Sequence, residues 1–466
     1  MQYRSTGWGN RMLIKNGIVV NEDGRAQADV RTENGKIVTV GTDLQPYGAE
    51  EIMDVKGAFI LPGGVDVHTH IDMPAGECMT SDDYLSGTKA AVMGGTTTVM
   101  DFPEYDEGET LQDGLNCWHK KSGGRAFCDY GFHMTVSGWE EGTKEELARM
   151  KEQGITSFKA YTAYQDGIGV YDEQLFLILQ EMKKLGTLLC VHCENGDVLK
   201  CLQRQLKEKD ASDIRNHPRS RPNLTEKEAV SRVIDLAVMA DVPVYIVHVS
   251  TREAAEVIRQ AKKNGHKVYA ETCPQYLLLD ESCYELPGFE SAKYVLSPPL
   301  RTKADQEALW QAIADGTIDV ISTDHCSFRF HGQKDLGRED FTRIPNGIPG
   351  IETRMELMLE YGTRRGLSLE KLTALLSSEP ARIFGMYPEK GTVREGSDAD
   401  LIIVREGLAH RITGETLSQD VDYTPYEGFE VTYQIQDVFV KGIQAKKEGK
   451  WVMERQEGRF LKTKLS

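Results

Sequence analysis

The sequence predicts an α/β fold in which a (β/α)8 TIM-like barrel is joined to a small β-sandwich domain formed by both chain ends. Strand-like and helical stretches alternate through the middle of the chain, which is typical of a parallel sheet with crossover helices. Both ends instead carry short strands and tight turns. The length of 466 residues suits a barrel of about 250 residues plus a second domain.

The N-terminal segment is predicted to form short antiparallel strands. Residues 12–20 are strand-like and contain an Asn16-Gly17 turn, and a second turn, Asn34-Gly35, precedes a further strand. Residues 1–11 have no clear pattern, because the regular segment begins at Met12. Whether residues 1–11 are native is left open.

The C-terminal segment has the same character as the N-terminal one. Residues 401–404, 438–440 and 449–452 are strand-like and are separated by glycine-containing turns. The simplest architecture that accounts for both ends is one discontinuous domain with the middle of the chain inserted into it. We assign residues 1–60 plus 390–466 to this β-sandwich domain.

The middle of the chain, residues 61–389, is assigned to the barrel. About eight strand–helix units can be counted there, which favours a closed barrel over an open doubly wound sheet. No glycine-rich phosphate loop follows the first strand, which weakens a dinucleotide-binding interpretation. The clearest strand-like runs are residues 96–100, 188–191, 243–247 and 318–321, and the clearest helical stretches are residues 172–184 and 225–239.

Composition excludes several classes of partner. The formal net charge of −17 argues against nucleic acid, which requires a basic face. No apolar run approaches the roughly 20 residues that span a membrane, and no signal-peptide pattern is present. The nine cysteines are scattered and odd in number, so we interpret them as reduced and the protein as cytoplasmic.

The sequence His68-Thr69-His70 follows an apolar run. Residues i and i+2 of a strand point to the same face, so both imidazoles would project together from one strand end. A His-x-His pair alone is weak evidence for a metal site, because two hydrogen-bonded core histidines would look the same.

Further metal-binding residue types stand at or near the ends of other apolar runs: Lys159, His192, His248 and Asp324. Each has an ordinary structural alternative, such as a buried hydrogen-bonded histidine or an aspartate that caps a helix. In a (β/α)8 barrel, however, the carboxyl ends of the strands together form the active site. The set therefore favours a metal centre.

These residues lie in motifs that resemble the amidohydrolase superfamily, and within it the dihydropyrimidinase/hydantoinase family of cyclic amidases. The resemblance covers nearly the whole chain from about Met12. The motifs that carry it are Pro62 to His70, Phe158-Lys159-Ala160-Tyr161, Val191 to Asn195, Val247 to Ser250, Glu271 to Leu277, Leu296 to Arg301, and Thr323 to Cys326.

The resemblance implies two divalent metal ions per subunit, most readily Zn²⁺. His68, His70 and Asp324 would hold the more buried ion, and His192 and His248 the more exposed one. Lys159 would bridge both as N6-carboxylysine, formed with CO2. A free ammonium beside two dications is repelled, so the neutral amine would be available for carboxylation.

The implied reaction is hydrolytic ring opening of a 5,6-dihydropyrimidine or a 5-substituted hydantoin to an N-carbamoyl amino acid. A hydroxide bridging the metals would attack the ring carbonyl, and Asp324 would move the proton to the leaving nitrogen. The hydroxyl of Tyr164 would stabilise the oxyanion. The substrate would be bound by Tyr164 and by the backbone around Ser297 and Asn346.

Single residues help to distinguish this activity from related ones. Dihydroorotases usually carry His-x-His-x-Arg, but Asp72 occupies the arginine position here and would repel an orotate-like anion. An allantoinase-like ureide hydrolase remains an alternative, because its substrate is also a ureide ring. A non-catalytic scaffold is disfavoured because every ligand position is intact. The loops 72–80 and 161–169 are expected to frame the pocket.

The resemblance also implies a homotetramer. Tyr423, Tyr426 and Phe429 place three aromatic residues in a short C-terminal segment outside the barrel. Aromatic residues are enriched at interface cores, but they could equally pack the β-domain on its own barrel. Both interpretations of this segment stay open at the level of sequence.

Overall fold

The structure is a computed structural model that describes residues 11–465. Of residues 1–11, whose native status the sequence leaves open, all but Arg11 lie outside the described residues.

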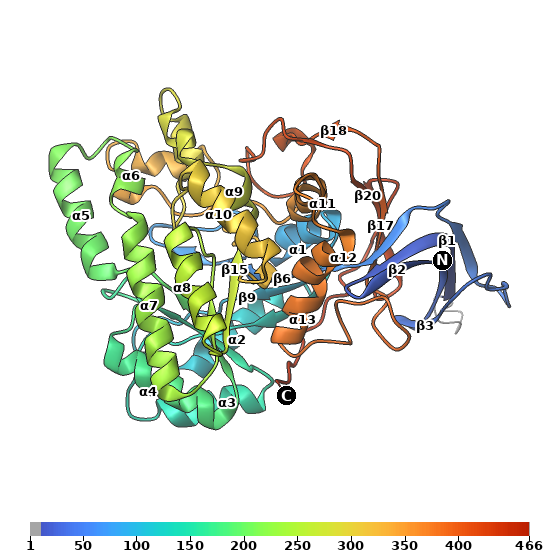
Figure 1. The fold of residues 1–466 in the computed structure, drawn as a ribbon, viewed down its shortest axis with the longest axis horizontal. Coiled ribbons are helices and arrows are strands. Elements are labelled where there is room, and N and C mark those ends of the chain that lie inside the picture. Colours follow the sequence, from blue (N-terminus) through green and yellow to red (C-terminus); the bar gives the residue numbers. More distant parts are fainter. Residues whose placement is uncertain (1–10, 466) are drawn as a thin grey trace.

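One sheet is built from strands of both chain ends, which lie side by side in Figure 1. Its order is β22-β21-β20-β17-β5-β1-β2-β3, with β4 paired to β1. The two ends meet where β5 pairs with β17 in antiparallel fashion and Leu61 lies opposite Ile402. The strands of this sheet are β1 (Arg11–Asn21), β2 (Gly24–Glu33), β3 (Lys36–Gly41), β4 (Glu51–Asp54), β5 (Phe59–Pro62), β17 (Leu401–Arg405), β20 (Gln434–Val440), β21 (Ile443–Lys447) and β22 (Lys450–Trp451).

The Asn16-Gly17 pair does not form the predicted turn. Strand β1 continues through it, and its pairing with β2 shifts register there, so the pair is a bulge. Asn16 has a φ of 60°, which asparagine tolerates better than most residues. A Cβ on Gly17 would lie 2.3 Å from Cδ1 of Ile60, so the bulge depends on glycine for its close approach to β5. Asn34-Gly35 does form the predicted turn, between β2 and β3.

The long sheets in the middle of the chain are parallel throughout, which confirms the α/β class. One has the order β10-β9-β6 and the other runs from β11 to β16 in sequence order. An isolated parallel bridge joins Thr69, at the end of β6, to His325, which follows β16. The strands are β6 (Gly64–Thr69), β9 (Thr96–Asp101), β10 (Asp129–Phe132), β11 (Met134–Thr135), β12 (Ser157–Tyr161), β13 (Leu188–His192), β14 (Val244–Ile246), β15 (Val268–Thr272) and β16 (Val320–Ile321).

Helices follow these strands, and α4, α7 and α8 pack side by side along one flank (Figure 1). The two helices predicted most clearly correspond to α4 and α7. Within residues 11–465, no helix is both long enough and apolar enough to cross a bilayer. The helices are α1 (Tyr84–Met93), α2 (Leu111–Ser122), α3 (Thr143–Glu152), α4 (Asp172–Leu185), α5 (Gly196–Lys209), α6 (Asn216–Arg219), α7 (Asn223–Ala240), α8 (Arg252–Lys263), α9 (Pro274–Leu278), α10 (Lys303–Ala314), α11 (Arg354–Arg364), α12 (Leu369–Thr373) and α13 (Glu379–Ile383). Short antiparallel pairs join β7 (Pro74–Ala75) to β8 (Cys78–Met79), and β18 (His410–Arg411) to β19 (Glu430–Val431).

Helix α4 illustrates how the sequence sets the ends of a helix. Asp172 and Glu173 occupy its first turn and Lys183 and Lys184 its last, so charges of opposite sign lie at the favourable ends of the helix dipole. Gly186 ends the helix in the left-handed conformation that glycine adopts without strain.

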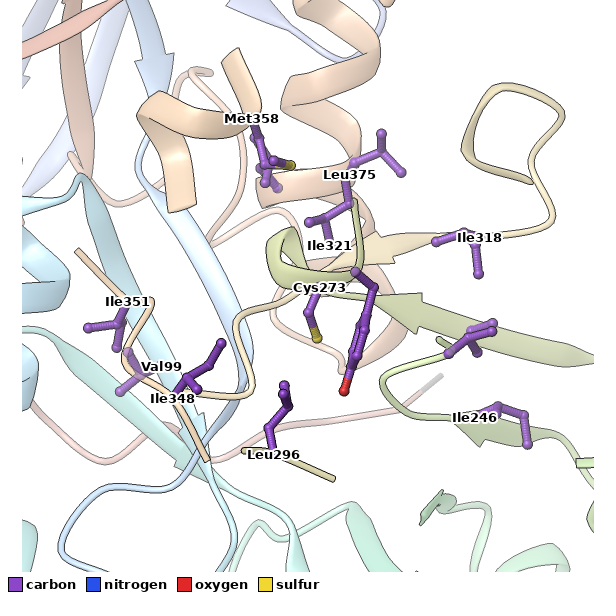
Figure 2. Close-up of a cluster of buried hydrophobic side chains, with 14 of the residues drawn as sticks. Val99, Ile246, Cys273, Leu296, Ile318, Ile321, Ile348, Ile351, Met358 and Leu375 are labelled. Carbon is purple, nitrogen blue, oxygen red and sulfur yellow. The ribbon is translucent and has the colours of Figure 1, made fainter. Parts of the chain in front are cut away.

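The parallel strands are held by a close-packed apolar core. Figure 2 shows part of it, where side chains from the strands meet those of the following helices. Ile246 of β14, Ile321 of β16 and Met358 of α11 have no exposed surface. Truncating one such side chain to alanine typically costs about 2–5 kcal/mol. Because this core leaves little room for movement, the residues at the strand ends are held in defined positions.

The C-terminal aromatic residues pack within their own chain. Tyr423 is 6% exposed, and Tyr426 is fully buried with its hydroxyl 3.4 Å from Oε1 of Gln275. Phe429 lies edge-on to Tyr426 and to Tyr361 of α11, with ring centroids 5.8 and 5.6 Å apart. Of the two interpretations of this segment, the structure supports intramolecular packing.

Candidate metal centre

His68 and His70 leave the end of β6 toward Asp324, which follows β16. The Nε2 atoms of both histidines lie 3.2 Å from Oδ1 of Asp324. Burial alone would raise the pKa of Asp324, but the charge and hydrogen bond of His68 hold it well below its usual range. The predicted residues are therefore brought together by the parallel bridge between these two strand ends.

His192 and His248 form a second pair beside the first. His192 ends β13 and His248 follows β14, and Nδ1 of His192 lies 2.9 Å from Nε2 of His248. Burial lowers the pKa of both imidazoles, that of His248 well below its usual value. Two neutral imidazoles carry one lone pair each, which is the form that binds a metal ion. Atoms of His68, His248 and Asp324 lie within 4.8 Å of one another, as a shared metal site requires.

Lys159 lies in the middle of β12 with 1% of its surface exposed. Its Nζ atom is 4.6 Å from the ring centroid of Phe102 and 4.9 Å from that of Tyr161. No carboxylate forms an ion pair with it among residues 11–465. Burial therefore lowers the pKa of Lys159, which favours the neutral amine.

Three predicted site residues have strained backbones. The φ angles are 36° for His248, 53° for Asp324 and 64° for Tyr164, in the left-handed region that residues with a Cβ rarely adopt. Such strain persists only where the surrounding structure enforces it, and it is concentrated at functional sites. Sequence alone does not reveal it, because none of the three is a glycine.

Two buried glutamates that sequence reasoning missed orient the histidines. Oε1 of Glu271, on β15, contacts Nδ1 of His68, which leaves Nε2 of that ring for the centre. Oε2 of Glu194 lies 2.9 Å from Nε2 of His192, which leaves Nδ1. Carboxylates commonly fix the tautomer of metal-binding histidines in this way. Both glutamates lie inside the motifs quoted above. Glu194 is two positions from its partner His192, whereas Glu271 is 203 positions from His68.

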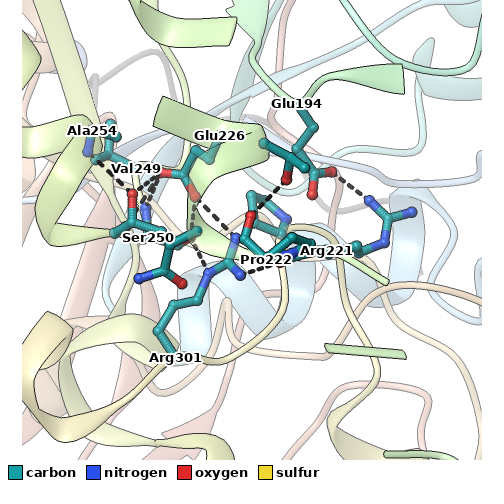
Figure 3. Close-up of polar contacts among 12 residues, drawn as sticks. Glu194, Arg221, Pro222, Glu226, Val249, Ser250, Ala254 and Arg301 are labelled. Atoms are coloured by element: carbon teal, nitrogen blue, oxygen red, sulfur yellow. Dashed lines mark hydrogen bonds and ion pairs between the residues drawn. The ribbon is translucent and has the colours of Figure 1, made fainter. Parts of the chain in front are cut away.

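Glu194 belongs to a larger network of buried charges (Figure 3). Burial opposes its ionisation, but the charge of Arg221 and the hydrogen bond from His192 lower its pKa to about 2. Arg221 donates to Glu194, and its own carbonyl accepts from Arg301. Arg301 also donates to Oγ of Ser250 at 3.0 Å and pairs with Glu226. The network therefore ties the segments that follow β13 and β14 to each other.

A cavity of about 780 Å³ opens onto His70, His192 and His248. The predicted substrate residues Tyr164, Ser297 and Asn346 line its wall, as do His70, Lys159 and Asp324. The loops 72–80 and 161–169 contribute to its rim, as expected. Tyr164 is 37% exposed, and its hydroxyl lies 3.4 Å from Nη2 of Arg221.

The residues present fit a pair of divalent metal ions. Among residues 11–465, Nδ1 of His70 is buried without a hydrogen-bond partner, which is costly unless another ligand satisfies it. Imidazole and carboxylate donors suit zinc and similar transition metals. Lys159 lies beside these donors and forms no ion pair within residues 11–465.

Comparison with known proteins identifies the family of this chain. The amidohydrolase family model matches residues 59–445. The D-hydantoinase of Geobacillus stearothermophilus is 43% identical over 97% of this chain and 96% of its own, and that of Streptomyces coelicolor is 40% identical over 93% and 94%. The crystal structure of dihydropyrimidinase from Brevibacillus agri NCHU1002 matches with a TM-score of 0.96 and 43% identity over 98% of this chain and 99% of that one. The chain belongs to the amidohydrolase family, and within it to the hydantoinases and dihydropyrimidinases.

Proposed function

We propose that this protein opens the ring of a 5,6-dihydropyrimidine or a 5-substituted hydantoin by hydrolysis, releasing an N-carbamoyl amino acid. The observation that carries the proposal is that His70, His192, His248, Lys159 and Asp324 line one cavity, with His68 in contact with Asp324 beside them. Full-length similarity to proteins named D-hydantoinase and dihydropyrimidinase supports the same substrate class.

The proposed cofactors are two divalent metal ions, with Zn²⁺ as the first choice. His68, His70 and Asp324 would hold one ion, and His192 and His248 the other. When bound, such ions lower the pKa of a water molecule toward neutrality and polarise a carbonyl group. The neutral Lys159 amine would add CO2 and release a proton, giving a carbamate with one oxygen for each ion.

The chain itself supplies proton transfer and oxyanion binding. The carboxylate of Asp324 faces the cavity, where it can take the proton of the attacking water and deliver it to the ring nitrogen that leaves. The hydroxyl of Tyr164 can donate a hydrogen bond to the oxygen that becomes negative in the tetrahedral intermediate. Backbone groups at Ser297 and Asn346 suit the alternating acceptors and donors of a ureide edge.

We further propose that residues 61–389 form a closed (β/α)8 barrel, and that residues 1–60 with 390–466 form a β-sandwich. The parallel strand order and the Thr69–His325 bridge support closure of the barrel. A homotetramer remains a proposal based on family resemblance. A cytoplasmic location is supported by the nine cysteines, all of them free thiols.

A ring-opening assay tests the proposal directly. The purified protein is offered dihydrouracil, hydantoin, aryl-hydantoins and allantoin, and its metal content is measured in the same sample. We expect turnover of dihydrouracil or the hydantoins, and loss of that turnover in Asp324→Asn. Turnover of allantoin alone would identify an allantoinase-like enzyme. A metal-loaded protein that opens none of these rings would indicate a non-catalytic relative.

A further inference from the structure

Lys334 is a second fully buried lysine in the structure, and it lies outside the metal centre. Its side chain has no exposed surface, and it begins a short helical turn, Lys334–Gly337. An ammonium group carries three hydrogen-bond donors and no acceptor. Burying it is costly unless each donor finds a partner. The partners of Lys334 therefore indicate what it holds in place.

All three donors of Lys334 reach backbone carbonyl oxygens. Nζ lies 2.7 Å from the oxygen of Val295, 2.6 Å from that of Pro345 and 2.7 Å from that of Gly347. These carbonyls belong to two segments far apart in the sequence. The amide of Gly347 also donates to the carbonyl of Val295 at 3.0 Å, so the two segments are paired directly as well.

The three carbonyls bracket the proposed substrate contacts. Pro345 and Gly347 are the two neighbours of Asn346, and Val295 precedes Ser297 by two residues. Asn346 and Ser297 both line the cavity. The carbonyls on either side of Asn346 are turned toward Lys334, whereas the carbonyl of Asn346 faces Sγ of Cys326 at 3.7 Å, and Cys326 also lines the cavity.

The residue before Lys334 extends this connection to the rim of the cavity. Nε2 of Gln333 donates to the carbonyl of Met79 at 2.6 Å, and its Oε1 accepts from Oγ of Ser81 at 2.7 Å. Met79 belongs to the β7–β8 hairpin, whose residues also line the cavity. One short turn therefore contacts both substrate segments and the rim.

We propose that Lys334 is a positioning residue for substrate binding, which fixes the spacing between the backbone groups of Ser297 and Asn346 that receive the edge of the ring. This inference rests on the proposed function, because it assumes a cyclic amide in the cavity. The side chain of Lys334 does not line the cavity and contacts backbone carbonyls, so its effect passes through the backbone. Loss of the ammonium loosens both segments and weakens ring binding, while the metal centre and Asp324 stay in place.

The test compares Lys334→Met, which keeps the length of the side chain but removes its donors, with a matched control. Lys446→Met serves as the control, because Lys446 of β21 is also buried and its Nζ donates at 2.8 Å to the carbonyl of Met93 at the end of α1, and neither residue lines the cavity. KM, kcat, metal content and melting temperature are measured for both variants and for the unaltered enzyme, on the ring that the latter opens best.

For Lys334→Met we expect KM to rise about tenfold or more with kcat within about threefold of the parent, the pattern of lost ground-state binding. Metal content should be unchanged, and Lys446→Met should lose thermal stability without a change in KM. If Lys334→Met does not fold, Lys334→Gln gives the same readout with a shorter donor.

An unchanged KM in the folded variant, or a loss confined to kcat or to metal content, would overturn the positioning role. If the unaltered, metal-loaded enzyme opens no ring at all, the proposed function fails, and the role of Lys334 falls with it. The two failures are therefore distinguished by the activity of the unaltered enzyme.

Discussion

Oε2 of Glu194 lies 2.9 Å from Nε2 of His192, and the opposite nitrogen of the same ring lies 2.9 Å from Nε2 of His248. The carboxylate therefore binds the proton on one side of the imidazole and leaves the lone pair on the other side for the centre. Arg221 keeps the carboxylate charged. A residue only two positions from His192 thus determines which of its nitrogens is available.

Glu194→Gln should weaken metal binding by about 10–100-fold, the usual cost of removing a residue that orients a ligand. The amide can donate to Nε2 of His192, which would place the proton on Nδ1. Metal titration of the metal-free protein measures the effect. Glu181→Gln is the control, because Glu181 is buried on α4 and pairs with Lys184 instead. Equal affinity in Glu194→Gln and the parent would contradict the orienting role.

The intact protein should contain about two transition-metal ions per chain. Chelation should abolish ring opening, and Zn²⁺, Mn²⁺ or Co²⁺ should restore it. Elemental analysis and activity are measured on the same sample at each stage. A fully active preparation without transition metal would be incompatible with the proposed centre.

Lys159→Ala should abolish activity and lower metal content, because no other side chain there supplies one oxygen to each of two ions. Short carboxylic acids added to the variant should restore part of the activity by occupying the space of the missing group. The rescue is measured as kcat against acid concentration. Substantial turnover without any additive would show that carboxylated Lys159 is not required.

Tyr164→Phe should lower kcat by roughly 10²–10³, the usual effect of removing one oxyanion donor. The ring would keep its contacts with Tyr161 and His192, since only the hydroxyl is lost. Steady-state kinetics and metal content are the measurements. A near-normal kcat would assign Tyr164 to packing rather than to the reaction.

Glu104 predicts a pH-dependent stability. It lines the cavity without a hydrogen-bond or ion-pair partner among residues 11–465, and burial, followed by the charge of Asp101, raises its pKa from 4.5 to about 7. Between these pH values the folded state binds more protons than the unfolded state. The contribution of Glu104 to the free energy of unfolding is therefore fully present below about pH 4.5 and is lost as the pH rises through 7.

Glu104→Gln removes this dependence. Relative to the parent, the variant should gain about 1–3 kcal/mol in unfolding free energy at pH 8, and the gain should shrink toward zero near pH 4.5. Denaturant unfolding at several pH values measures it, with exposed Glu107→Gln as control. A gain that does not vary with pH would contradict the assignment to this carboxyl group.

Much of the metal centre could be predicted from sequence because its donors lie at the ends of regular strands. His68 and His70 share a face through strand alternation, and His192 and His248 end or follow strands of the same parallel sheet. The residues that orient them could not be predicted in the same way. Glu271 reaches His68 across 203 sequence positions, and only the folded chain brings the two together.

Local backbone features were the least predictable part of the fold. Asn-Gly is a turn signal at both of its positions in the N-terminal segment, but only Asn34-Gly35 lies between two strands that pair with each other. On either side of Asn16, Ile14 and Gly17 pair with β2, so the same dipeptide is accommodated at a bulge. Whether Asn-Gly forms a turn or a bulge depends on how the flanking residues pair with other strands, and the dipeptide itself does not determine that pairing.

The pairing of β5 with β17 affects how the chain is made. Pro62 lies opposite Leu401, so the partner of β5 leaves the ribosome long after β5 itself, roughly 20–70 s later at about 5–20 residues per second. During this interval the growing chain exposes an unpaired strand edge, which can pair with other chains. Synthesis of nearly the whole barrel region must therefore precede completion of this sheet, although its first strands are made before that region.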